Sequence, residues 1–113
     1  MKNQVSFQPL QKITISAKEN LNAFRFVSHL GSLCALGSKS LGTVDKDWLK
    51  DKNASVITLG TVPIEVSTTV RIGDNISSGN EGIGKPAEED EAINARSLDD
   101  CTGAGIVKAI LVP

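Results

Sequence analysis

The feature that most constrains the fold is an alternation of apolar and polar residues with a period of two. It runs over residues 12–17, 61–67 and 69–72. This period places apolar side chains on one face of a β-strand. Residues 106–112 are apolar except for Lys108, as expected for a strand covered on both faces or paired in an interface. Further candidate strands are residues 24–30 and 56–59. The pattern predicts about seven or eight short strands.

Glycines fall between the apolar runs, where turns often need a positive φ. They are Gly31, Gly37, Gly42, Gly60, the Gly73-Asp74 pair, the loop 79–82 and the turn 103–105. Residues 45–52 are charged and lack alternation, which favours a short helix capped by Asp45. Pro63 has no amide hydrogen, so its strand is expected at an edge or a bulge. We predict a mainly β fold: a small single-domain β-barrel or β-sandwich meander with at most one short helix.

The composition limits size, core and partners. With 113 residues the chain supports a single core, and only 4% of residues are aromatic, so the core is aliphatic. A net charge of -1 gives no attraction to nucleic acid, so none is expected as a partner. No signal peptide and no apolar run of roughly 20 residues is present, which predicts a chain made in the cytoplasm without a membrane partner.

The two cysteines are single and far apart in the sequence. Neither Cys34 nor Cys101 lies in a Cys-x-x-Cys motif. In a chain made in a reducing compartment, such residues are usually small buried hydrophobes, and a disulfide between them is the alternative.

Residues 1–11 differ from the rest of the chain. They are polar, amide-rich and interrupted by Pro9, yet Val5, Phe7 and Leu10 are spaced so that an extended segment presents them. Two interpretations are open: an unordered terminus, or an arm that adds to a sheet edge of another chain. We therefore divide the chain into an extended N-terminal arm, residues 1–11, and a β-rich domain, residues 12–113.

Motifs that would carry chemistry are weak. His29 lies in an apolar run with no signature that links it to a cysteine. The carboxylates of residues 88–91 lack the ligand spacing of a calcium loop and are expected to be solvated. Lys85 lacks the neighbours of a lysine that carries a covalent cofactor. The sequence thus predicts no enzyme, no cofactor and no metal site.

The C-terminal third contains a Gly-Asp turn at residues 73–74, a Gly-Lys-Pro-Ala hairpin at 84–87, an Ala-containing strand, the Gly-Ala-Gly turn at 103–105 and a closing apolar strand. Together with residues 22–27 and 60–66, this order resembles the capsid cement, or head decoration, proteins of tailed phages. The resemblance covers the chain from Ile13 onward. The charged residues 46–52, with Trp48, depart from the Ala- and Gly-rich middle usual in the family.

The resemblance implies a structural virion protein on the exterior of an expanded capsid. Such proteins commonly bind as homotrimers at three-fold and quasi-three-fold positions and stabilise the head against the pressure of its DNA. The partners implied are the major capsid protein and further copies of the chain.

Two details of this interpretation stay open. We expect Val5, Phe7, Leu10 and Trp48 to contact the capsid, although the Trp48 ring equally suits the end of a barrel. The alternative from another class is a small β-barrel that binds a ligand or serves as an accessory module of a larger assembly.

Overall fold

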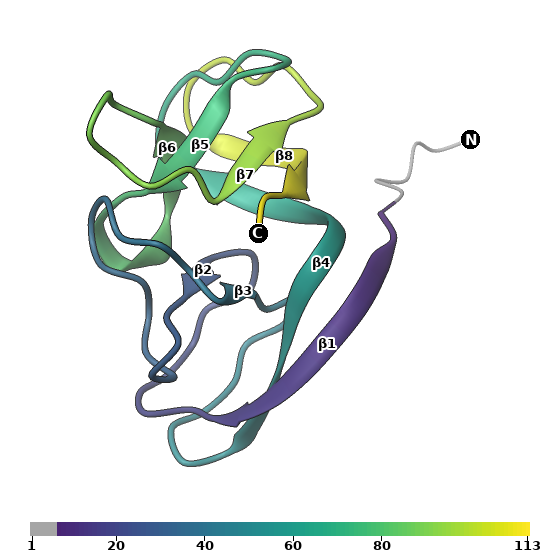
Figure 1. The fold of residues 1–113 in the computed structure, drawn as a ribbon, viewed down its shortest axis with the longest axis vertical. Coiled ribbons are helices and arrows are strands. Elements are labelled where there is room, and N and C mark those ends of the chain that lie inside the picture. Colours follow the sequence, from purple (N-terminus) through teal and green to yellow (C-terminus); the bar gives the residue numbers. More distant parts are fainter. Residues whose placement is uncertain (1–6) are drawn as a thin grey trace.

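One 14-residue strand, β4 (Asn53–Val66), connects the parts of the domain. The computed structural model describes residues 7–113 and forms a mainly β fold (Figure 1). The other strands are β1 (Pro9–Ser16), β2 (Phe26–Val27), β3 (Gly42–Thr43), β5 (Asn75–Ser78), β6 (Gly84–Pro86), β7 (Ala95–Ser97) and β8 (Gly105–Leu111), with one 3-10 turn, η1 (Asn80–Gly82). The predicted fold class, a small single-domain β-barrel, is confirmed.

The barrel consists of the five strands β4, β6, β5, β7 and β8 in that order, and it closes because β8 pairs with β4. The order differs from the order in the chain, since β6 lies between β5 and β4. The contact between β4 and β6 is a single parallel pair, Val66 with Gly84. In Figure 1, β5 to β8 and the second half of β4 lie in the upper part of the view, and the first half of β4 runs downward beside β1.

Gly60 lies at a bend in β4 where the strand changes partners. Before the bend, β4 pairs with β1 and β3; after it, residues 61–66 pair with β8. Gly60 has a φ of +111°, and a Cβ on it would lie 2.4 Å from the carbonyl oxygen of Gln8. The expected corner is therefore a bend inside one long strand, which only glycine fits.

The buried apolar side chains form two clusters. The first fills the barrel and consists of Phe26, Cys34, Ile57, Val62, Ile64, Val66, Val70, Ile76, Ala95, Val107, Ala109 and Leu111. The second lies under the loops around β2 and β3 and consists of Ala17, Leu21, Val27, Val44, Ala54 and Val56. Both clusters are aliphatic apart from Phe26 and Cys34, as the composition predicts. β4 contributes to both of them, so it joins the two packed regions.

The short helix predicted over residues 45–52 is wrong. Trp48 instead bridges to Leu21: its amide donates to the Leu21 carbonyl at 2.9 Å, and the Leu21 amide donates back at 2.8 Å. Asp47, close by, accepts the Ala23 amide at 2.8 Å. These partners lie more than twenty residues away in the sequence, so local propensity does not reveal them.

Two strand expectations also need comment. Residues 69–72 form no strand, because Val70 makes only an isolated bridge to Cys101. Pro63 lies within β4, where β8 occupies one edge. On the other edge, Thr61 donates to Gln8 and Glu65 donates to Phe24, at 3.1 and 2.8 Å. Because alternate residues of a strand face opposite edges, the missing amide of Pro63 faces away from β8 and leaves no ladder bond unmade.

Candidate interaction surfaces

The residues that the sequence offered for chemistry do not form a catalytic group. His29 is exposed, whereas Cys34 is fully buried in the barrel cluster. Burial raises the pKa of the Cys34 thiol, which keeps it protonated and unreactive. Both cysteines are free thiols. Across residues 7–113 no three His, Cys, Asp or Glu side chains gather as a metal site would require, and no helix is long and apolar enough to cross a membrane.

Lys85 and Glu91 form an ion pair that the sequence analysis did not find. Their side chains are only 17% and 14% exposed, and Glu88 lies 3.6 Å from the Lys85 ammonium. The hydrogen bond from Lys85, followed by the backbone amide of Glu88, lowers the pKa of the Glu91 carboxyl. Glu91 is therefore not solvated as expected, and it joins the loop after β6 to the barrel. Lys85 is held in place and is not presented to a ligand.

β1 carries the first exposed apolar surface. Its strand partner within residues 7–113 is β4 alone, so its outer edge has no neighbour there. Phe7, Leu10 and Ile13, and Leu59 of β4, which pairs with Gln11, are 36%, 66%, 40% and 40% exposed. We call these four residues the β1 surface. Val5, the remaining member of the predicted arm contacts, lies outside the described residues. β1 itself begins at Pro9, within the range expected for the arm.

Trp48 is in a different position from the arm residues. It is partly buried and packs against the second cluster, as does Ile15 of β1. Its indole Nε1 is buried with no hydrogen-bond partner, and the Lys46 ammonium lies 4.3 Å from the ring centroid. The neighbouring Leu49 is 64% exposed and faces solvent.

The second exposed apolar surface lies on the outside of the barrel. Leu98, Ile106 and Ile110 are 39%, 50% and 43% exposed. We call these three residues the β8 face. Sequence reasoning assigned the closing strand to a core or an interface without identifying this face. The signal in the sequence is that Ile106, Lys108 and Ile110 occupy every second position of the strand, so their side chains share one face.

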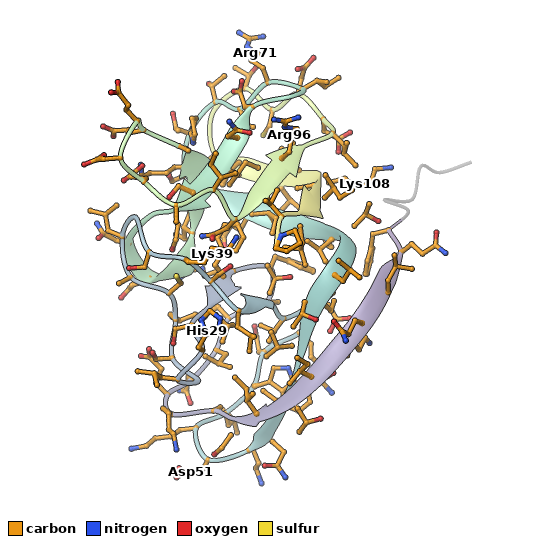
Figure 2. The ribbon with its side chains drawn as sticks, viewed as in Figure 1. His29, Lys39, Asp51, Arg71, Arg96 and Lys108 are labelled. Atoms are coloured by element: carbon orange, nitrogen blue, oxygen red, sulfur yellow. The ribbon has the colours of Figure 1, made fainter. Side chains whose placement is uncertain are left out.

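A small cavity lies between the end of β8 and the loop that leads to β3. Its volume is about 150 Å³, and its lining includes His29, Lys39, Thr58 and Asn94. The Lys39 ammonium donates to the carbonyl oxygens of Ile93 and Val112, at 2.8 and 2.6 Å. Desolvation lowers the pKa of this amine. Lys39 thus anchors the end of the chain at the mouth of the cavity, and Figure 2 shows Lys39 and His29 in the middle of the view.

No protein-family model and no curated protein sequence matches this chain. Among solved structures, the N base of head fibre gp8.5 from bacteriophage phi29 is similar, with a TM-score of 0.75. The two proteins share a fold. The similarity covers 90% of this chain and 93% of the phage protein, at 18% sequence identity. It therefore includes the barrel and also most of the region outside it.

Proposed function

We propose that this chain is a structural protein of a tailed-phage virion that binds the outside of the expanded head, as trimers at three-fold and quasi-three-fold positions. The observation that supports this most strongly is the fold it shares with a head-fibre base over nearly the full length of both chains. In this proposal the barrel is an attachment module and not an enzyme. It stabilises the shell against the outward pressure of packaged DNA.

The physical basis is the addition of small contacts. One copy of an 11.9 kDa chain offers a modest area, but three linked copies engage adjacent shell subunits together, which raises the effective concentration of each contact. A ligand that binds the expanded lattice and not the unexpanded one shifts the equilibrium toward expansion. The same preference opposes rupture of the shell.

The β1 surface is the proposed contact with the major capsid protein. It combines exposed apolar side chains, chiefly Phe7 and Leu10, with a strand edge that has no partner among residues 7–113. Such an edge binds an extended segment through main-chain hydrogen bonds. Val5, which precedes the described residues in the sequence, is proposed to take part in the same contact. Trp48, which is partly buried, belongs to a second proposed contact together with its exposed neighbour Leu49.

The test is co-sedimentation of the purified protein with heads of its own phage that have been stripped of it. We expect saturable binding to expanded heads and none to unexpanded heads. Binding to neither form would contradict the proposal. Equal binding to both would contradict the role in stabilising the expanded state.

A pair of substitutions tests whether the affinity for heads depends on the β1 surface or on exposed apolar side chains in general. Leu10→Ser removes a side chain that is 66% exposed on β1, and Leu36→Ser removes one that is 56% exposed in a loop. Losing one apolar contact of this size costs about tenfold in affinity. We expect that loss for Leu10→Ser alone, with the melting temperature of both variants near that of the wild type. Equal affinities for both variants would place the capsid contact elsewhere.

The cavity beside Lys39 favours a second candidate, a ligand-binding or accessory module. Its volume of about 150 Å³ is small. Pockets for drug-sized ligands typically span roughly 300–1,000 Å³, so only a very small polar molecule fits here. A screen of small carboxylates and phosphates by thermal shift tests this candidate, and a stabilised melting temperature that Lys39→Met abolishes would support it.

A further inference from the structure

The cavity beside Lys39 is lined by both polar and aliphatic residues. Leu41, Leu111 and Val112 bring aliphatic side chains to its lining, and Lys39, Ser40 and Asn94 bring polar ones. Leu111 belongs to the barrel cluster, and Ser40 and Asn94 are also buried. Much of the lining is therefore part of the packed fold.

Asn94 fixes the shape of this cavity. Its side-chain oxygen accepts the Ser40 amide at 3.0 Å, and its side-chain nitrogen donates to the Ser38 carbonyl at 3.0 Å. Its own backbone amide donates to the Ile76 carbonyl at 2.8 Å, and its carbonyl accepts the Val112 amide at 3.0 Å. These bonds join the loop before β3 to β5 and to the end of β8, so the cavity is formed before a ligand arrives.

The Lys39 ammonium places a positive charge at the mouth of the cavity. Two of its three N–H groups are used by the carbonyl oxygens of Ile93 and Val112, at 2.8 and 2.6 Å. Carbonyl groups carry no net charge, and across residues 7–113 no carboxylate forms an ion pair with this ammonium. Burial lowers the pKa of the amine, because the ammonium form is less well hydrated than in water. One N–H and the positive charge are therefore left for a ligand.

Charge and access both favour an anion as that ligand. Within the described part of the chain, neither Asp nor Glu contributes to the lining, whereas His29 adds a further nitrogen donor. Lys39 and His29 are both exposed residues, so a solute reaches them from solvent. An ammonium group without a carboxylate partner binds anions through charge-assisted hydrogen bonds. The cavity is therefore suited to an anion rather than to a cation.

The aliphatic residues determine which anion fits best. Phosphate and sulfate present oxygen atoms on every side, and burying such atoms against Leu41 and Leu111 without donors is unfavourable. A short aliphatic carboxylate has its charge at one end and an alkyl chain at the other. That chain gains free energy when aliphatic side chains cover it. The volume of about 150 Å³ limits the chain to a few carbon atoms.

We infer that this cavity binds a short aliphatic carboxylate, with the carboxylate at the Lys39 ammonium and the alkyl chain against Leu41 and Leu111. A free acid such as propionate offers this group, and so does an Asp or Glu side chain of a partner protein. The inference names the ligand class of the second candidate function, on which it rests. It does not depend on the virion role.

The partner protein is a possible source because the cavity borders β1. The Thr58 hydroxyl, which belongs to the lining, donates to the Gln11 side-chain oxygen at 3.0 Å. Gln11 lies in β1, the strand that we propose contacts the shell. A shell segment along β1 would therefore lie next to the cavity.

Titration of the wild type with sodium propionate tests the inference directly. The readout is the chemical shift of backbone amides, with sodium chloride and sodium phosphate at equal ionic strength as controls. We expect saturable shifts that are largest in residues 39–42 and 111–112, with a dissociation constant on the order of millimolar. Acetate, which has a shorter chain, should bind several-fold more weakly. Absence of saturable shifts with propionate would overturn the inference, as would equally tight binding of phosphate.

Two substitutions with the same change in charge locate the site. Lys39→Met removes the ammonium from the cavity, and Lys108→Met removes one from the outside of β8, apart from Lys39 in Figure 2. We expect Lys39→Met to weaken propionate binding at least about tenfold and Lys108→Met to leave it unchanged. Equal weakening by both would show that only net charge matters and would contradict the site.

A third variant guards against a loss of folding, because Lys39→Met also removes two hydrogen bonds. Leu41→Ala keeps the charge and shortens an aliphatic side chain of the lining. We expect this variant, verified as folded by circular dichroism, to bind propionate no more tightly than acetate. A folded Leu41→Ala variant that keeps the full preference for propionate would contradict the placement of the alkyl chain.

Head binding distinguishes the two sources and separates the two proposals. If a partner side chain fills the cavity, saturating propionate and Lys39→Met both weaken binding to expanded heads several-fold. If a free acid is the ligand, neither changes head binding. A protein that binds propionate but no heads overturns the virion role and leaves this inference standing. A protein that binds heads but no propionate does the reverse.

Discussion

β8 and β1 both run antiparallel to β4, but they differ in what lies on their other edge. β8 pairs with β7 and closes the barrel, whereas β1 has β4 as its strand partner within residues 7–113. Val107, Ala109 and Leu111 of β8 are buried, and every residue of β1 is at least partly exposed. β1 alternates apolar and polar residues, and β8 is apolar except for Lys108. Both patterns predict a strand with a buried face, so the difference in burial comes from their place in the fold.

This difference separates stability from recognition. The barrel gains its stability from a closed ring of strands around an aliphatic core, and within residues 7–113 its strands pair with one another around the ring. β1 adds few buried contacts and keeps backbone groups and apolar side chains available. A strand of this kind is suited to a contact that forms only when the partner is present.

The largest expected effect comes from the barrel core. Ile64→Ala empties a fully buried position and is expected to lower the free energy of unfolding by about 3 kcal/mol. Ile13→Ala, on β1, removes a side chain that is 40% exposed and is expected to cost about 1 kcal/mol or less. Urea denaturation measures both. Equal losses would mean that β1 belongs to the same packed unit as the barrel, and the comparison would fail.

The bend between the two regions gives an intermediate effect. Gly60→Ala places a Cβ 2.4 Å from the Gln8 carbonyl oxygen at a φ of +111° and is expected to cost about 2–3 kcal/mol. Gly73→Ala is the control, since its φ is also positive, at +88°, and no atom lies within 4 Å of the added Cβ. We expect about 1 kcal/mol for that control. If Gly73→Ala lowered the free energy of unfolding as much as Gly60→Ala does, the close approach of Gly60 to the segment at the start of β1 would not explain the cost.

A smaller effect depends on pH and concerns the barrel side. The pKa of Glu91 is lowered in the folded state, so its pairing with Lys85 stabilises the fold above the unfolded pKa of about 4.3 and is lost as the pH falls through the folded value. The difference in unfolding free energy between the wild type and Glu91→Gln should therefore be constant near neutral pH and shrink below about pH 4.3. Glu89→Gln, at an exposed position, should show no such change. A difference that persists at low pH would contradict the ion pair.

The alternating pattern predicted much of this architecture. Residues 12–17 and 106–112 lie largely in β1 and β8, and the aliphatic composition matches the two clusters. The pattern also placed Ile72 in a strand. That prediction was wrong, because its amide donates to the Asp100 carboxylate in a turn and its side chain is 64% exposed. Alternation over four residues is too short to distinguish a strand from such a turn.

What the sequence did not predict depends on contacts between distant residues. The sequence predicts a turn between strands at Gly60, but in the structure Gly60 lies at a bend inside β4, next to the carbonyl oxygen of Gln8. The segment around Trp48 reads as a helix, but its bridge to Leu21 makes it extended. The β8 face is a property of three paired strands, so it appears only when their register is known.

Hydrogen exchange of the protein, free and bound to expanded heads, tests the central claim most directly. In the free protein we expect slow exchange for peptides of β8 and fast exchange for peptides that cover residues 9–16. On head binding, the peptides of β1 should become protected, and those of the barrel should change little. Head binding with no added protection in β1 would contradict the assignment of this strand as the surface that meets the shell.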